Sequence, residues 1–390
     1  MEGQTRLSLT TSGQDTMQPL IISDPEPLYA PDLLDILDTF LASKRNRTTA
    51  TTQSAYRRHY QPFRRWWQDH ASEHGEALSP DSLEAFYTWL RIDCRTRADA
   101  LYSPQSVYTT AVRVRQFLNW IRDHSAVTVD ISQWMPLPPQ PTIERRFLSV
   151  PEIQALFDGL ANFRPFKVSR FRFRDAALLA LLVDTGARRL ELASALQEDV
   201  HWHGICQSCG ALTMVSSRRS GIDQAGPICC GKPDVFYDRS GHIKLRRVKK
   251  NFRGEEKARE VVFGPVAGAA LRLHLDTIAF ADLASANAAT LFGMSDTAIR
   301  FRIDKLSEAT GIYCHAHAFR YTMSDYWQRA NRDRMQATLW LKVQLGHAIP
   351  RDVTFVHYTD LSNPASRLEG LRAHRRTPMD DVQMPDLWNP

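Results

Sequence analysis

A run of prolines about a third of the way along the chain constrains the fold most strongly. Residues 135–141 read Met-Pro-Leu-Pro-Pro-Gln-Pro. Proline lacks a backbone N–H and clashes with the preceding helical turn, so neither a helix nor a central strand can pass through this run. The 390 residues are enough for a hydrophobic core on each side. We therefore expect two domains, at 29–134 and 148–376, joined by a stiff linker at 135–147 and followed by a C-terminal tail at 377–390.

The part of the chain before the prolines predicts a polar tail and four helices. Residues 1–28 are polar and lack the basic and then apolar pattern of a signal peptide, so we expect a flexible tail. Apolar residues with helical spacing follow in four stretches, which begin near positions 32, 51, 80 and 104. This spacing predicts a small four-helix domain.

Two of the four predicted helices carry arginines beside their apolar stripe. A solvated helix face is the ordinary role of such residues. Thr, Gln and Tyr side chains accompany these arginines, however, and such groups also bind phosphate oxygens, which favours contact with DNA. The candidate DNA-binding residues are Arg57, Arg58, Arg64, Arg65, Arg113 and Arg115.

The C-terminal half holds four short motifs of cationic and nucleophilic residues. They are Thr-Gly-Ala-Arg-Arg-Leu-Glu-Leu at 185–192, His-Ala-Phe-Arg at 317–320, Leu-Gly-His at 345–347 and Tyr-Thr at 358–359. His317 and Arg320 are three residues apart and share a helix face. The apolar run before Gly346 indicates a helix that ends there and leaves His347 at its C-terminus. Two guanidiniums can bind the oxygens of a phosphodiester while a phenol attacks its phosphorus.

These four motifs, in this order, resemble those of the tyrosine recombinase/integrase family. The resemblance implies a mainly α fold with a small antiparallel β-sheet, in which an N-terminal helical core-binding domain precedes a catalytic domain. It implies site-specific cleavage and rejoining of double-stranded DNA through a 3′-phosphotyrosine, with neither ATP nor a catalytic metal, to integrate, excise or resolve a mobile element. It also implies a homo-tetramer on paired DNA sites, a monomer or dimer when free, accessory recombination proteins, and a cytoplasmic location at a bacterial nucleoid.

The resemblance assigns roles to the residues of the motifs. Tyr358 is the expected nucleophile, and Arg188 and Arg320 are expected to bind the scissile phosphate. Adjacent helical residues point about 100° apart, so only one of Arg188 and Arg189 can face the site, and register with the family motif selects Arg188. Glu191 shares the face of Arg188 and is expected to orient its guanidinium.

Two histidines and a lysine complete the expected site. His317 is the candidate general base, whereas His315 lies on a different helix face from Arg320. His347 is expected to donate a hydrogen bond to the phosphate. The family places a catalytic lysine in a β-hairpin, which the sequence predicts at 242–263. Lys250 is the first candidate for it and Lys249 the second.

A cysteine-rich segment at 201–241 departs from the family pattern. Cys206 and Cys209 have the spacing that lets two thiolates occupy adjacent corners of a zinc tetrahedron. Cys229 and Cys230 are adjacent and form a poorer chelate, and a histidine at 201 or 203 could replace one of them. Reduced cysteines in a loop are the alternative. Four protein ligands leave no open position, so a zinc ion here would be structural. The clustering of cysteines favours a reducing compartment over a disulfide framework.

Charge and hydropathy narrow the class of partner. The net charge of +6 favours a polyanion. The longest apolar helix, at 176–183, is too short to cross a bilayer, so we expect no membrane partner. Residues 363–375 predict a last helix that packs either on a neighbouring protomer or on its own chain. Two other activities fit the same site: a type IB topoisomerase and a telomere resolvase. A non-catalytic zinc-containing DNA-binding protein would keep the basic helices without needing Tyr358.

Overall fold

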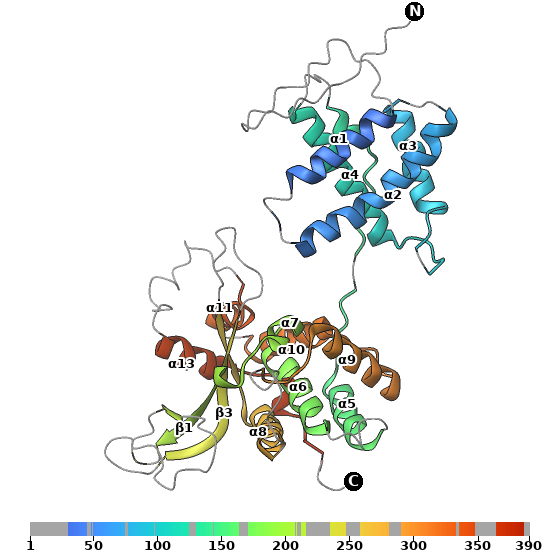
Figure 1. The fold of residues 1–390 in the computed structure, drawn as a ribbon. Helices are drawn as coiled ribbons and strands as arrows, with labels where there is room; N and C mark the ends of the chain where they lie inside the picture. The colour runs from blue at the N-terminus through green and yellow to red at the C-terminus, as the bar shows by residue number, and fades with distance from the viewer. Residues whose placement is uncertain are drawn as a thin grey trace, which may run out of the picture. The chain divides into compact units, whose positions relative to one another are not determined.

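The chain divides into two compact units, residues 1–144 and residues 145–390 (Figure 1). The boundary lies within the proline-rich linker. The computed structural model describes residues 30–44, 48, 50–74, 77–96, 98–124, 130–142, 144–163, 171–206, 208, 212–215, 235–246, 258–280, 290–332, 335–347 and 364–385. Within these ranges, no helix combines the length and apolarity that crossing a membrane requires.

The N-terminal unit consists of helices around an aromatic core. Its elements are α1 (Ala30–Ser43), α2 (Ala50–His74), α3 (Pro80–Ile92), α4 (Pro104–His124) and the short 3-10 helix η2 (Ile131–Trp134). Phe63 of α2 meets Phe86 of α3 edge to face, with ring centroids 5.1 Å apart, and Phe40 of α1 lies 5.4 Å from Phe117 of α4. Each helix thus contributes a buried ring to one core, because the apolar residues recur with helical spacing.

The C-terminal unit is mainly helical and contains a small antiparallel sheet. Its helices are α5 (Val150–Asn162), α6 (Arg172–Thr185), α7 (Arg189–Ala193), η3 (Gln197–Asp199), α8 (Pro265–Phe280), α9 (Asp296–Thr310), α10 (Ala316–Ala330), α11 (Met335–Leu345), α13 (Pro364–His374) and η4 (Pro378–Asp380). Its strands are β1 (Val200–Cys206), β2 (Leu212–Val215), β3 (Val235–Leu245) and β4 (Arg259–Phe263). The predicted fold class, mainly α with a small antiparallel sheet, is confirmed.

Helix α6 forms the centre of this unit. Every residue from Asp175 to Thr185 is buried, which requires apolar side chains on all sides of the helix and explains the run Ala-Ala-Leu-Leu-Ala-Leu-Leu-Val at 176–183. The helix packs against α5, α8, α10 and β4. The turn that follows it, which holds Gly186 and Arg188, therefore begins inside the core.

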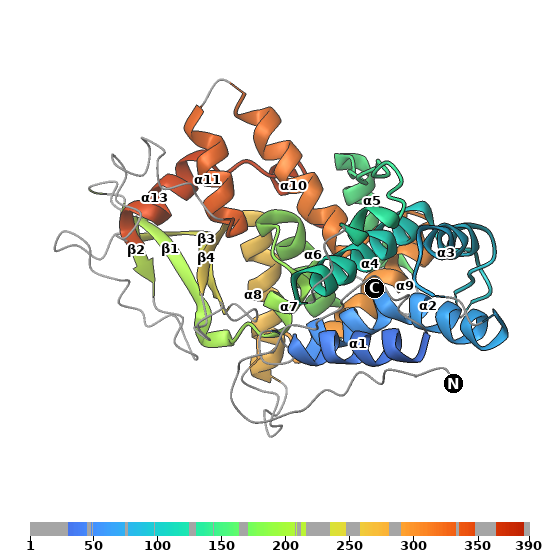
Figure 2. The same ribbon diagram turned by 90° about the horizontal axis from the view of Figure 1, so that it is seen from above.

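The sheet has the strand order β2-β1-β3-β4, with antiparallel pairing throughout. Leu245, the last residue of β3, pairs with Arg259, the first residue of β4, at the turn end of the β3–β4 hairpin, which matches the hairpin predicted at 242–263. Helix α8 packs on β3, and α11 and α13 pack on β4 (Figure 2). The insertion expected at 201–241 is corrected in part, because residues 201–206 and 235–241 are strand residues of this sheet.

The C-terminal segment packs on its own chain. Leu368 and Leu371 of α13 are buried in one cluster with Trp340 and Leu345 of α11. The tail expected at 377–390 is wrong for its first residues, since Thr377, Met379 and Val382 are buried. Two carboxylates explain this burial: Arg375 forms ion pairs with Asp184 of α6 and with Asp380. Because the charge of Arg375 is paired, the segment that holds it can be buried against the core.

Candidate active site

Arg320 connects three segments of the C-terminal unit. Its side chain leaves the second turn of α10, and the residue is only 6 % exposed. Nη1 donates to the carbonyl oxygen of Gly186 at 2.6 Å, and Nη2 donates to that of Leu345 at 2.6 Å. Nη2 also lies 3.2 Å from Nε2 of His347. One buried guanidinium thus gathers the motifs at 185–192, 317–320 and 345–347.

Two glycines make this approach possible. Gly186 has φ +60°, and a Cβ there would overlap the Cε of Met323. Gly346 has φ +65° and ends α11 as predicted. The N–H of Gly346 donates to the carbonyl of Val343, and the N–H of His347 donates to that of Lys342, which is the hydrogen-bond pair of a Schellman motif. This turn leaves the His347 side chain exposed beside Arg320.

Arg188 stands at the N-cap of α7 and is bound to Glu191. The main-chain N–H of Arg188 donates to Oε2 of Glu191 at 2.7 Å, and Nη1 donates to Oε1 at 3.0 Å. The expectation that residues 188 and 189 are both helical is corrected, because Arg188 is extended and the helix begins at Arg189. Arg189 instead binds both carboxylate oxygens of Asp296 on α9, at 2.6 and 2.9 Å.

The structure adds Arg259, which no sequence motif had indicated. Arg259 is the first residue of β4, and its Nε and Nη2 donate to the two oxygens of Glu191 at 3.3 and 2.7 Å. Nη1 donates to the main-chain carbonyl of Gln344. The sequence offered one signal, a basic residue shortly before the apolar strand residues Val-Val-Phe, but nothing local shows that this side chain turns toward Glu191.

These residues form a cluster with more positive than negative charge. Among the described residues, the carboxylate of Glu191 pairs with Arg188 and Arg259, and its charge also acts on Arg320. Burial of Glu191 acts to raise the pKa of its carboxyl, but the attraction of Arg259 and then of Arg188 outweighs it and lowers that pKa to about 2. Burial, followed by repulsion from Arg259 and Arg188, lowers the pKa of Arg320 to about 9. An anion bound among the guanidiniums would relieve this repulsion.

The histidines of the site differ in exposure and partners. His317 is exposed on the first turn of α10, with its ring stacked on Tyr321. Burial and nearby arginines, Arg320 first, lower the pKa values of both His317 and His347, which favours neutral imidazoles at neutral pH. His315 caps α10, and its Nδ1 accepts from the N–H of Ala318 at 3.1 Å. This histidine therefore has a structural role.

Several predicted residues lie outside the described part of the chain. They are Tyr358, Lys249, Lys250, Cys209, Cys229 and Cys230. Cys206, the remaining cysteine of the predicted zinc site, is buried at the end of β1. Among the residues that the structure describes, no group of three His, Cys, Asp or Glu side chains is arranged to hold a metal ion.

Two of the predicted DNA-binding arginines in the N-terminal unit are engaged in internal contacts. Arg115 donates to the carbonyls of Ser132 and Met135, both at 3.1 Å, and so ties η2 to α4. Arg65 stacks on Trp89, with its guanidinium 4.9 Å from the ring centroid. These contacts stabilise the domain, and DNA contact by the two residues stays a prediction.

The other four arginines differ in exposure and in partners. Arg57 and Arg58 are exposed on α2, Arg64 pairs with Asp38 of α1, and the guanidinium of Arg113 lies 5.0 Å from the ring centroid of Tyr56. A hollow of about 740 Å³ between α1 and α2 is lined by Lys44, Gln53, Ser54, Tyr56, Arg57, Arg58 and Arg64, among others. Its lining combines these basic and polar residues with Asp38, Leu41 and Ala42.

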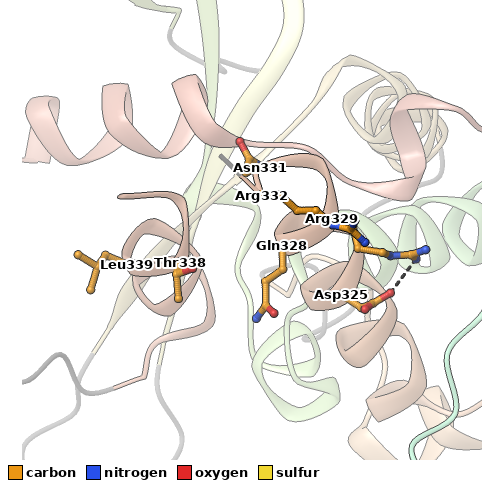
Figure 3. A pocket seen from close by; sticks show the side chains of 7 residues that line it. All are labelled: Asp325, Gln328, Arg329, Asn331, Arg332, Thr338 and Leu339. Atoms are coloured by element: carbon orange, nitrogen blue, oxygen red, sulfur yellow. Dashed lines mark ion pairs between the residues drawn. The ribbon is translucent and has the colours of Figure 1, made fainter. Parts of the chain in front are cut away.

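A second hollow lies at the other end of α10. Its volume is about 640 Å³, and Figure 3 shows the side chains around it: Asp325, Gln328, Arg329, Asn331, Arg332, Thr338 and Leu339. Arg329 is paired with Asp325 there at 2.7 Å. None of the candidate catalytic residues that the structure describes lines this hollow.

Solved structures with the same fold include complexes of XerH, a site-specific recombinase, and of lambda integrase. The pre-cleavage complex of XerH with its difH substrate has a TM-score of 0.53 and 10 % identity, and the match covers 94 % of this chain and 98 % of XerH. The post-cleavage complex of XerH with palindromic difH has a TM-score of 0.50 and 12 % identity, covering 83 % of this chain and 82 % of that one. A lambda integrase dimer bound to a COC′ core site has a TM-score of 0.50 and 13 % identity, covering 88 % and 80 %.

The similarity is one of fold. No protein-family model matches the sequence, and the curated proteins include no match to it. At 10–13 % identity, the solved structures show that the chain has the tyrosine recombinase fold over most of its length. Fold alone does not define an activity, so the function depends on the chemistry of the site.

Proposed function

We propose that this chain, which has the fold of the tyrosine recombinases, is a site-specific recombinase that cuts and rejoins DNA strands through a phosphotyrosine at Tyr358. One observation carries the proposal: Arg188, Arg320 and His347, from separate motifs, converge with Glu191 in a cluster of surplus positive charge. A cluster of this kind suits a phosphodiester, whose negative charge increases during transfer.

Arg188 and Arg320 have different parts in binding the phosphate. The Arg188 side chain is 39 % exposed, and within the described residues only Nη1 of its guanidinium donates, so Nε and Nη2 are the proposed donors to a non-bridging oxygen. Arg320 is buried and forms the floor of the site, where its positive charge acts at short range in a low dielectric. Both charges are placed before the substrate arrives, which keeps the reorganisation energy small.

His347 is proposed to donate to the same phosphate. Arginine is only a donor, so Nε2 of His347, which lies 3.2 Å from Nη2 of Arg320, must be the unprotonated nitrogen. The proton of the neutral ring is then on Nδ1. The contact with Arg320 thus fixes the tautomer and leaves one N–H for a phosphate oxygen.

In the proposed reaction the phenol oxygen of Tyr358 attacks the phosphorus of a DNA phosphodiester. A bond forms between this oxygen and phosphorus while the bond from phosphorus to the 5′ oxygen breaks. His317 takes the phenol proton, and Lys250, with Lys249 as the alternative, gives a proton to the leaving 5′ oxygen. The 5′-hydroxyl of another strand then reverses these steps. The phosphodiester bond energy is conserved, so neither ATP nor a catalytic metal is needed.

The proposal includes DNA and further copies of the chain as partners. Arg57 and Arg58 at the basic hollow of the N-terminal unit are the proposed contacts to the DNA backbone. The XerH and lambda integrase structures hold DNA, and the latter holds a dimer. We extend this to a tetramer on two paired sites. We also propose a structural zinc ion at the cysteine-rich segment. Metal analysis of the purified protein tests this proposal. One zinc ion per chain would support it, and protein without zinc would refute it.

A nicked suicide duplex tests the activity. DNA flanking the gene supplies the candidate sites, and the nick lets a short fragment diffuse away after cleavage, which traps the covalent intermediate. The wild-type chain should form an adduct that survives denaturation, and Tyr358→Phe should bind the duplex equally well without forming it. Strand transfer between two sites, compared with relaxation of supercoiled DNA, separates a recombinase from a type IB topoisomerase. A protein that binds but never forms the adduct would be a non-catalytic DNA-binding protein.

A further inference from the structure

The guanidinium of Arg259 is surrounded by acceptors of its own chain. Its side chain is only 11 % exposed. Nε and Nη2 donate to the two oxygens of Glu191, and Nη1 donates to the carbonyl of Gln344. Each of the three nitrogens is therefore engaged with the protein. A residue held in this way is placed to orient its neighbours, unlike Arg188, whose guanidinium is partly open to solvent.

The contacts of Arg259 involve two parts of the site: the Arg188–Glu191 pair and the end of α11. On one side Glu191 holds the main chain and the guanidinium of Arg188. On the other side Gln344 lies two residues before Gly346, and a Cβ at Gly346 would overlap the Arg259 side chain. The side chain of Gln344 also binds the N–H and the carbonyl of Val262 in β4, at 3.1 and 3.0 Å. Strand β4 thus holds the last turn of α11 in position.

Arg259 also affects how much of the positive charge of Arg188 is neutralised by Glu191. Glu191 is 4 % exposed, and a buried carboxylate with Arg188 as its main cation would bind that arginine tightly and neutralise it. Because Arg259 takes two of the hydrogen bonds of the carboxylate, Glu191 is shared between two cations. Arg188 then keeps net positive charge for an incoming anion.

We propose that Arg259 is a positioning residue, which presents Arg188 through Glu191 and His347 through the end of α11 to the scissile phosphate. This inference rests on the proposed recombinase function and assigns Arg259 no contact with DNA. Positioning of this kind matters because misplacing a catalytic group by about 1 Å can cost roughly 100-fold in rate.

The first test separates binding from cleavage. Arg259→Gln should lower the single-turnover rate of adduct formation on the suicide duplex by about 100-fold while the Kd for the duplex changes less than about twofold. The matched control is Arg302→Gln, which removes another arginine paired with a buried carboxylate, Asp175, away from the site. The cleavage rate of the control should stay within about threefold of wild type. A direct phosphate contact by Arg259 would give a different result. The Kd of Arg259→Gln for the duplex would then rise, and the slope of log binding constant against log salt concentration would fall by about one. That result would overturn the proposal.

The second test is a double-mutant cycle on the cleavage rate. Because Arg259 acts on Arg188 through Glu191, Arg259→Gln should slow cleavage by less than about tenfold when Glu191→Gln is already present, compared with about 100-fold in wild type. Arg259→Lys keeps the charge without the paired hydrogen bonds and should fall between wild type and Arg259→Gln. If Arg259 served only for packing, the loss would be equal in both backgrounds, and that result would refute the positioning role.

A third test needs no activity. Urea denaturation of wild type, both single variants and the double variant gives the coupling between Arg259 and Glu191. Each substitution lowers the folding equilibrium constant by some factor. If the two residues acted independently, the factor for the double variant would be the product of the two single factors. We expect the folding equilibrium constant of the double variant to be about tenfold or more above that value. If wild type forms no adduct, the proposed function fails, and this cycle still decides whether Arg259 acts through Glu191. Independent effects of the two substitutions would overturn the inference.

Discussion

Nη2 of Arg320 lies 3.2 Å from Nε2 of His347, and this contact joins the last turn of α11 to the middle of the site. It fixes the position of the imidazole ring and determines which nitrogen carries the proton. Substituting His347 by leucine removes the proposed donor to the phosphate without adding charge. Adduct formation should fall by about 100-fold, because one preorganised donor is lost.

The control for this substitution is His374→Leu at the end of α13, where Nδ1 contacts the carbonyl of Gly370 and not the site. Single-turnover cleavage by the control should match wild type. Equal losses in both variants would point to a general effect on folding and contradict the role of His347.

Gly186 should be intolerant of any side chain. Alanine there combines the left-handed backbone with an overlap on Met323, so Gly186→Ala should lower the free energy of unfolding by roughly 3 kcal/mol. Gly311 has a similar φ of +69°, but an added methyl group there would meet no atom of a non-adjacent residue within 4 Å, so Gly311→Ala should cost only about 1 kcal/mol. Urea denaturation measures both. Equal costs would show that packing around Gly186 is unimportant.

The ion pairs of Glu191 predict a pH dependence of stability. Its pKa in the folded state, about 2, lies below its ordinary value of 4.5. The stabilisation is therefore fully present above pH 4.5 and is lost as the pH falls toward 2, with a magnitude of roughly 3 kcal/mol. Unfolding free energies between about pH 5 and about pH 3 should fall less steeply in Glu191→Gln than in wild type. Parallel curves would contradict this account of the carboxylate.

Arg375 should hold the C-terminal segment on the core. Arg375→Gln leaves the fully buried Asp184 without its cation and should cost roughly 3 kcal/mol of unfolding free energy. The neighbouring Arg376 is exposed, so Arg376→Gln should change stability by less than about 0.5 kcal/mol. In limited proteolysis of the Arg375→Gln variant, the first cleavage should fall within residues 375–385. Identical digestion of both variants would argue against the ion pair as the anchor.

The parts of the fold that depend on local pattern were predictable. Apolar periodicity indicated the N-terminal helices, and Gly346 marked the end of α11 because only a residue that tolerates positive φ closes a helix in this way. The spacing between His317 and Arg320 placed both on the first two turns of one helix, α10. The structure also brings Arg188, Glu191, Arg320 and His347 together.

The contacts that join distant segments were not predictable. Arg259 lies 68 residues from Glu191 and 85 from Gln344, and no local pattern states which arginine of a hairpin turns inward. Arg115 looked like the other exposed arginines, but its partners are backbone carbonyls, which leave no trace in sequence. The burial of Met379 depends on ion pairs made by Arg375 with residues both near and far along the chain.

Identification of the residue that carries the DNA tests the central claim most directly. Adduct trapped on the suicide duplex is digested with nuclease and protease, and mass spectrometry locates the remaining nucleotide. We predict a single modified peptide in which the 3′-phosphate is attached to Tyr358. Attachment to Tyr313, Tyr321 or Tyr326, or the absence of any adduct from protein that binds the duplex, would contradict the account.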